Sequence, residues 1–178
     1  GRAKHEEDWL YQQLQLEYRP MAGMRIVGEA NYRTDTYLYH QDVLTVYQTA
    51  VDGVNKGNAW NPNTSVNESV AKNNYFNINV YGDYEGTIEG GHYFKAMIGV
   101  QAEGNYSRDF GASRVGLMVP GLPTLNTTTG LGADGTTIPP SVWGSYGDWA
   151  TAGIFGRLNY NYQEKYLFEA NLRYDGTS

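Results

Sequence analysis

The 178-residue chain contains no cysteine, which excludes disulfide bonds and thiol chemistry. It also lacks any uninterrupted run of about 18 apolar residues, so a helical membrane protein is excluded. No charged segment followed by an apolar stretch marks a signal peptide. The 13 basic residues are outnumbered by 19 acidic ones and are spread along the chain, so no basic patch predicts nucleic-acid binding.

Aromatic residues and glycine are abundant instead. The chain holds 16 tyrosines and 22 glycines, and 14% of its residues are aromatic while 18% are charged. Disordered chains and coiled coils are typically poor in tyrosine and tryptophan. This balance therefore favours a β-rich protein.

Alternation of apolar and polar residues predicts six long strands. In the clearest of them, one face holds Phe76, Ile78, Val80, Gly82 and Tyr84, and the other holds Asn77, Asn79, Tyr81, Asp83 and Glu85. The six segments with this pattern are residues 10–18, 24–35, 75–85, 94–107, 152–162 and 166–175. Each predicted strand therefore has a mostly apolar face, called the apolar face below, and a mostly polar one, called the polar face.

The connections between these segments alternate in length. Short turns are predicted at residues 19–23, 87–92 and 163–165, and long loops at about 41–73 and 111–149. Outer-membrane β-barrels have short turns at one end, long loops at the other and aromatic girdles at the membrane interfaces. Seven tyrosines at strand ends on the apolar face are in girdle positions: Tyr18, Tyr32, Tyr84, Tyr106, Tyr162, Tyr166 and Tyr174.

We therefore predict an all-β fold, a segment of an antiparallel transmembrane β-barrel in the bacterial outer membrane, in contact with its lipid. An open six-stranded sheet in hydrocarbon would leave N–H and C=O groups unpaired along two edges. We therefore expect the chain to be an excerpt of a longer protein. The alternative is a soluble antiparallel sheet, although a sandwich usually shows turn signals about every 8–12 residues.

Two stretches resemble the SusC/RagA family of TonB-dependent outer-membrane transporters. The first is Gly91–Glu103, with the sequence GHYFKAMIGVQAE, and the second comprises Phe155–Tyr162 and Lys165–Ser178. Residues 81–84 and 117–130 add to the match. The resemblance spans most of residues 75–178, whereas the first 70 residues fit the strand pattern without a distinctive motif.

The resemblance implies that residues 1–178 are part of a single TonB-dependent-receptor β-barrel domain of about 22 strands. It further implies an N-terminal plug, energisation by the TonB complex, and import of glycan or peptide fragments together with a SusD-like surface lipoprotein. The family's plug, TonB-interacting segment and carboxypeptidase-like domain are absent from these 178 residues. A passive porin and a soluble carbohydrate-binding sheet remain alternative functions.

We expect no enzymatic activity, cofactor or metal site. The three histidines, His5, His40 and His92, lie in different hairpin regions without the close spacing of zinc ligands. Ser107 and Ser113 lie near Asp109, but no histidine belongs to that strand or loop, so a nucleophile with its base and orienting acid is not supported. The dipeptide Asp134–Gly135 predicts a turn rather than a calcium site.

Aromatic residues in the predicted long loops are the candidates for binding a solute or a partner protein. They are Trp60 in the first loop and Trp143, Tyr146 and Trp149 in the second. Exposed rings can stack on sugars or pack against a partner. They can equally fold a long loop against its neighbours, which is the simpler interpretation.

Charged residues predicted on the polar face are expected to face the barrel lumen as solvated or paired groups. They are Glu29, Arg33, Asp83, Glu103, Arg157, Glu169 and Arg173. The asparagines and tyrosines on the same face suit an uncharged polar solute.

Overall fold

The computed structural model describes residues 2–49 and 56–178. Its long strands are β1 (Arg2–Tyr18), β2 (Met24–Val43), β5 (Ser65–Ile88), β6 (His92–Val115), β7 (Ser141–Tyr162) and β8 (Tyr166–Thr177). The short elements are β3 (Tyr47–Thr49), β4 (Lys56–Ala59) and the 3₁₀ helix η1 (Leu125–Thr127). The predicted all-β fold with six long strands is confirmed.

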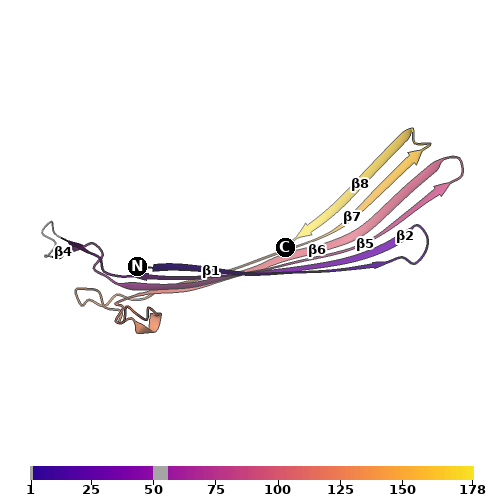
Figure 1. The fold of residues 1–178 in the computed structure, drawn as a ribbon. Coiled ribbons are helices and arrows are strands. Elements are labelled where there is room, and N and C mark those ends of the chain that lie inside the picture. The colour runs from indigo at the N-terminus through magenta and orange to yellow at the C-terminus, as the bar shows by residue number, and fades with distance from the viewer. Residues whose placement is uncertain (1, 50–55) are drawn as a thin grey trace. The chain divides into compact units, whose positions relative to one another are not determined.

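The long strands form one sheet in the order β1-β2-β5-β6-β7-β8, so each pairs with the long strands before and after it in the chain (Figure 1). β3 and β4 form a separate two-stranded sheet. β7 and β8 are antiparallel in unbroken register, from the Thr151 and Thr177 pair to the Tyr162 and Tyr166 pair. The predicted antiparallel topology is confirmed.

Short turns lie where the sequence predicts them. Gly23, Gly90 and Gly91 have positive φ angles of 79°, 93° and 84°, which glycine adopts without a steric cost from Cβ. Between β7 and β8, Gln163 and Glu164 also have positive φ, at 50° and 57°. Type I′ hairpin turns require positive φ at both central positions, although asparagine and glycine are the usual residues there.

The strand lengths were predicted less well, because four strands run far into the predicted loops. Among the described residues, the loop expected at 41–73 shrinks to the connections around β3 and β4, and the loop expected at 111–149 shrinks to 116–140. The prediction was wrong there because residues beyond Asp35 and Ser107 mix apolar and polar side chains on both faces. The strands stay paired beyond the point where the apolar–polar alternation ends, and it is this alternation that makes a strand recognisable in the sequence.

Contacts between Cα atoms divide the chain into two compact units. Unit 1 comprises Gly1–Asp8, Asp35–Lys72 and Ser107–Tyr146, and unit 2 comprises Trp9–Thr34, Asn73–Tyr106 and Gly147–Ser178. The short turns belong to unit 2 and the long connections to unit 1.

Unit 2 has the two faces that the alternation predicts. On the apolar face, side chains from four strands line one shallow cavity of about 510 Å³, among them Ile78, Val100, Ile154 and Tyr174. This face is exposed, with Ile98 at 74% and Leu172 at 80%. The polar face holds the buried side chains, which are Val27, Asn77 and Asp83. A soluble sheet buries its apolar face instead.

In unit 1, residues 116–140 form an ordered loop. The Leu117 amide donates to Thr64 Oγ1 at 2.8 Å, and the Ala133 amide donates to Asn63 Oδ1 at 2.8 Å. These bonds tie the loop to the residues that precede β5 and satisfy backbone donors that the loop would otherwise leave open.

Candidate functional site

Hydrogen bonds between side chains link the strands across the polar face of unit 2. On one side, Tyr11 Oη donates to Asn31 Oδ1 at 2.9 Å, and Asn31 Nδ2 donates to Asn77 Oδ1 at 3.5 Å. Asn79 Nδ2 donates to the same Asn77 oxygen at 2.8 Å. These bonds connect β1, β2 and β5 through neutral amide and phenol groups.

Further bonds reach β7 through a carboxylate and β8 through an amide. Tyr75 Oη donates to Glu103 Oε2 at 2.7 Å, and Thr151 Oγ1 donates to Glu103 Oε1 at 3.2 Å. Two residues before Glu103, Gln101 Oε1 accepts a bond from Arg173 Nη1 at 2.8 Å. We call the whole set the polar belt; its members are Tyr11, Asn31, Tyr75, Asn77, Asn79, Gln101, Glu103, Thr151 and Arg173.

An aromatic pair lies beside this carboxylate. The ring centroids of Tyr75 and Trp149 are 6.4 Å apart, with the ring planes at 51°. Trp149 is 42% exposed, so part of its indole is open to a ligand. The pair combines apolar ring surface with the Glu103 carboxylate, which is the combination of groups that binds amphiphilic polar solutes.

A charged cluster lies on the polar face near the short turns. The Arg25 guanidinium donates two bonds to Asp83 Oδ2, at 2.9 and 2.8 Å, and Asp83 is only 5% exposed. Lys95 Nζ and Tyr93 Oη each donate to Glu85 Oε2 at 3.1 Å. The charges in this cluster are mutually compensated, as expected for paired groups of the wall.

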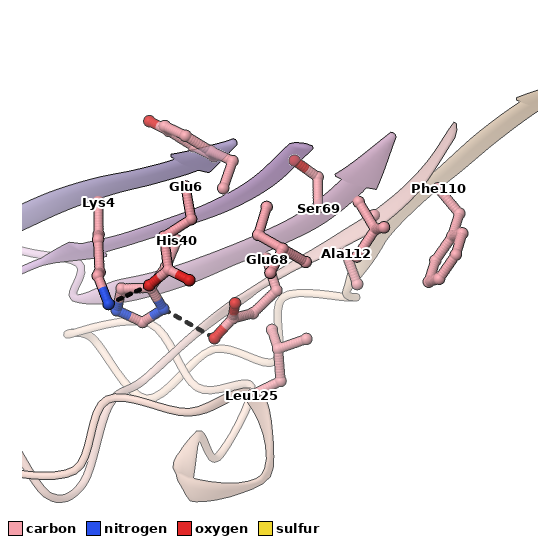
Figure 2. Close-up of a pocket in the computed structure, with 12 residues that line it drawn as sticks. Lys4, Glu6, His40, Glu68, Ser69, Phe110, Ala112 and Leu125 are labelled. Atoms are coloured by element: carbon pink, nitrogen blue, oxygen red, sulfur yellow. Dashed lines mark hydrogen bonds and ion pairs between the residues drawn. The ribbon is translucent and has the colours of Figure 1, made fainter. Parts of the chain in front are cut away.

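Unit 1 contains a separate pocket of about 380 Å³ (Figure 2). Its apolar lining includes Leu38, Val70, Phe110, Ala112 and Leu125. His40 Nδ1 lies 2.8 Å from Glu68 Oε1, and Lys4 pairs with Glu6. Because the lining acids outnumber the lysine, the pocket favours neutral or basic groups over anions.

This pocket holds a serine, a histidine and an acid, but it does not assemble them for nucleophilic catalysis. His40 is hydrogen-bonded to Glu68, and the Ser69 hydroxyl points away from His40 in Figure 2. A nucleophile must lie within hydrogen-bond reach of its base. The arrangement therefore lacks the contact between nucleophile and base that this kind of catalysis needs.

Three of the four aromatic candidates do not lie in a loop. Trp60 follows β4, within the predicted first loop, and is 78% exposed. Trp143, Tyr146 and Trp149 belong to β7, which begins at Ser141, so their predicted loop placement was wrong. The cause is the weak alternation at the start of β7, where glycine and polar residues occupy both faces.

Each of these β7 residues has its own surroundings. The Trp143 ring fills the space above Gly111, where a Cβ atom would collide with it, so a large ring on one strand covers a glycine on the next. Tyr146 is 64% exposed. Trp149 contacts Tyr75 on the polar face.

The histidines remain apart. His5 packs edge-on against Tyr37, His40 lies in the pocket of unit 1, and His92 Nδ1 lies 2.7 Å from the Tyr160 hydroxyl. Among the described residues, no three histidine, aspartate or glutamate side chains gather as metal ligands do.

Asp134 makes a turn, as its sequence context predicts. The Thr136 hydroxyl and amide both donate to Asp134 Oδ1, at 2.6 and 3.0 Å, and Gly135 adopts a positive φ of 79°. These hydrogen bonds favour the ionised carboxylate and lower the pKa of Asp134.

Sequence reasoning identified Glu103 and Trp149 but not their partners Tyr75, Gln101 and Thr151. All five are odd-numbered positions. Because side chains alternate between the two faces along each strand, this shared parity could have placed them on one face. Parity does not say which residues lie opposite one another, because that depends on the register between strands.

Comparisons with known proteins match this chain through its fold. No protein-family profile and no curated protein matches the sequence. Within residues 2–49 and 56–178, no helix has the length and apolar character needed to cross a membrane.

Solved structures of similar fold include the RagAB peptide transporter, with a TM-score of 0.82 and 15% sequence identity over 98% of this chain. The RagAB peptide importer in its open-open and closed-closed states gives a TM-score of 0.84 and 15% identity over 99% of this chain. The match covers 18% of each of those chains. The chain therefore has the fold of a transporter-chain segment and spans less than a fifth of the proteins that it resembles.

Proposed function

We propose that this chain is part of the wall of a TonB-dependent transporter barrel in the bacterial outer membrane. The observation that carries the proposal is the reversed burial in unit 2, where the apolar face is exposed and the polar face is hydrogen-bonded. Hydrocarbon is the solvent in which an exposed face of leucine, isoleucine and valine is favourable.

The lengths of the strands support a membrane crossing. Within unit 2, residues 9–18 of β1 and 24–34 of β2 supply about ten residues each, the length that a tilted transmembrane strand needs. The predicted apolar-face positions in this unit include no Asp, Glu, Lys or Arg. The other strand positions of the same parity include Lys4, Glu6 and Glu68 in unit 1 and Asp148 in unit 2, so the apolar surface is limited to the predicted segments.

β1 and β8 are the edges of the six-stranded sheet. Unpaired edges are unfavourable in hydrocarbon because their N–H and C=O groups have no partners. We propose that further strands of the same protein pair with both edges and close one barrel domain of about 22 strands.

The proposed transport is the import of glycan or peptide fragments with a SusD-like lipoprotein, energised by the TonB complex through a plug domain. The resemblance of Gly91–Glu103 and Phe155–Ser178 to the SusC/RagA family and the likeness to RagAB chains support it. Trp149 is proposed to contact the solute. Trp60, Trp143 and Tyr146 belong to unit 1 and are proposed to contact the partner protein.

The test is to express the complete reading frame that encodes this segment and to follow the protein into membrane fractions. We expect it in the outer membrane, with a mobility in SDS gels that changes on heating, and uptake that is lost when TonB is deleted. A barrel whose uptake persists without TonB would be a passive porin. Recovery in the soluble fraction would overturn the proposal in favour of a soluble binding sheet.

A further inference from the structure

We propose that Lys72 and Arg108, called the basic pair below, bind a phosphate group of an anionic lipid in the outer leaflet of the membrane. The inference rests on the proposed function, because it takes the apolar face of the sheet as the outer surface of the barrel. It depends on two cations that lie opposite one another on adjacent strands of that face, with no carboxylate to compensate them.

The register between β5 and β6 brings the two side chains together. A Cβ atom added to Gly111 would lie 2.7 Å from the Ser69 Cβ, so these residues are opposite one another on the paired strands. The last residue of β5 and the first residue of β6, on either side of their short turn, give the same register. Lys72, three residues after Ser69, therefore lies opposite Arg108, three residues before Gly111.

The basic pair lies at the point where the apolar face stops being apolar. Both residues are even-numbered, like the predicted apolar-face positions of β5 and β6. Counted from the short turn, the even-numbered positions of β5 contain no Asp, Glu, Lys or Arg before Lys72, and those of β6 contain none before Arg108. Tyr106, a predicted girdle tyrosine, precedes Arg108 by two residues. Because girdle rings sit among the lipid headgroups, the basic pair follows directly on the headgroup region.

Other cations of unit 1 are compensated, whereas the basic pair is not. Lys4 pairs with Glu6, and Arg114 Nη2 donates to the Thr129 carbonyl at 3.0 Å. Both members of the basic pair are exposed. Within residues 2–49 and 56–178, neither member forms an ion pair with a carboxylate.

Two cations in this arrangement favour a shared anion. Like charges directly opposite one another on a sheet repel, because their Cβ atoms are only about 4.5–5.5 Å apart. A phosphate between them removes the repulsion and accepts hydrogen bonds from both side chains. The Arg108 guanidinium can bond two phosphate oxygens at once, and the Lys72 ammonium adds a compact charge. The Phe110 ring, with its centroid 5.9 Å from Arg108 Cζ, holds the guanidinium by a cation–π contact.

The position of the basic pair favours a lipid phosphate over a free one. The pair belongs to unit 1, which holds the long connections, and in outer-membrane barrels these lie outside the cell. The nearest phosphates are then those of the outer leaflet. A lipid that already surrounds the barrel is held at a high effective concentration beside the site, whereas inorganic phosphate must be drawn from dilute solution.

The test uses the complete transporter, purified in detergent and freed of bound lipid. Native mass spectrometry measures its binding of lipid A with two phosphates and of the same lipid after removal of both. We expect the parent to bind the phosphorylated form about 30-fold more tightly, the combined attraction of two basic residues near an anionic group. Lys72→Gln and Arg108→Gln should each weaken that binding about fivefold and leave binding of the dephosphorylated lipid unchanged.

Lys95→Gln and Arg157→Gln are the matched controls, since they make the same changes on the polar face. Their affinities for phosphorylated lipid A should stay within about twofold of the parent, because the barrel wall separates them from the lipid. Heat-modifiable mobility of every variant shows that the barrel has folded.

Each remaining outcome identifies what has failed. Equal binding of the two lipids by the parent, or unchanged binding of the phosphorylated lipid in both basic-pair variants, would overturn the site. Displacement of the lipid by inorganic phosphate at equal concentration would overturn the lipid as its ligand in favour of a free anion. Failure of the parent protein to reach the outer membrane would instead overturn the proposed function.

Discussion

Adjacent residues on one strand point to opposite faces of the sheet, so a single step along the chain moves a side chain from the apolar face to the polar face. Ile98 lies on the apolar face and is 74% exposed, whereas Met97 has the opposite parity. In a soluble sheet, arginine would be harmless at an exposed position such as Ile98. In a bilayer, the same arginine would lie in hydrocarbon.

We therefore predict that Ile98→Arg destabilises the folded barrel by about 2–4 kcal/mol, the cost of a cation near the membrane midplane. Met97→Arg, the matched control, should cost less because its side chain points to the polar face. The measurement is the urea midpoint of the complete protein in lipid vesicles. Equal stability of the two variants would argue against lipid on the apolar face.

Ion pairs on the polar face differ in burial, which allows a second comparison between residues. Asp83 is 5% exposed and accepts two bonds from Arg25, whereas the Asp175 side chain is 44% exposed in its pair with Arg173. Asp83→Ala should cost about 1.5–3 kcal/mol, since it removes charge-assisted bonds and leaves Arg25 uncompensated. Asp175→Ala should cost less than about 1 kcal/mol. Chemical denaturation of both variants checks the difference, and equal losses would contradict it.

At the scale of elements, the β7–β8 hairpin turns through residues that are not suited to their backbone conformation. Glu164 has a φ of 57°, a region in which a side chain costs about 1 kcal/mol relative to glycine. Glu164→Gly should therefore stabilise the hairpin by roughly 0.5–1 kcal/mol and slow hydrogen exchange of the Lys165 amide, which bonds to the Tyr162 carbonyl. Faster exchange in the variant would contradict the turn geometry.

The turn at Asp134 is predicted to open in acid. Hydrogen bonds from Thr136 lower the pKa of Asp134 in the folded chain, so the carboxylate stabilises the turn above its unfolded pKa. That contribution is lost as the pH falls through the lowered folded pKa. The protection of the Thr136 amide against hydrogen exchange, relative to the intrinsic rate at each pH, should fall over this range in the parent protein. Asp134→Ala should show little protection at every pH, and a protection factor that does not change with pH in the parent would refute the prediction.

At the scale of the whole molecule, the six-stranded sheet has two edge strands and one exposed apolar face. We predict that residues 1–178 expressed alone need detergent to remain in solution and give no heat-modifiable band, because their edges stay unpaired. Gel filtration with and without detergent checks this. A detergent-independent monomer would mean that protein, not lipid, covers the apolar face.

The local features could be predicted from the sequence because they depend on residues close together in the chain. Alternation over Phe76–Tyr84 gave the two faces of β5, and the glycines near residue 90 gave the turn. The same logic failed for Trp143 and Tyr146, because β7 continues into a segment where neither face is consistently apolar. There, pairing with the neighbouring strand maintains the extended backbone, and no alternation in the local sequence indicates that a strand is present.

The sequence by itself determined the all-β class, the six long strands, the short turns and the composition of each face, since a strand's side chains alternate whatever lies beside it. Only the tertiary structure decided that Tyr75, Glu103 and Thr151 meet, and that Trp149 stands beside Tyr75. Those contacts depend on the register of four strands, which is fixed by hydrogen bonds between residues far apart in the chain. The candidate site is therefore a product of strand pairing, and no single segment of the sequence contains it.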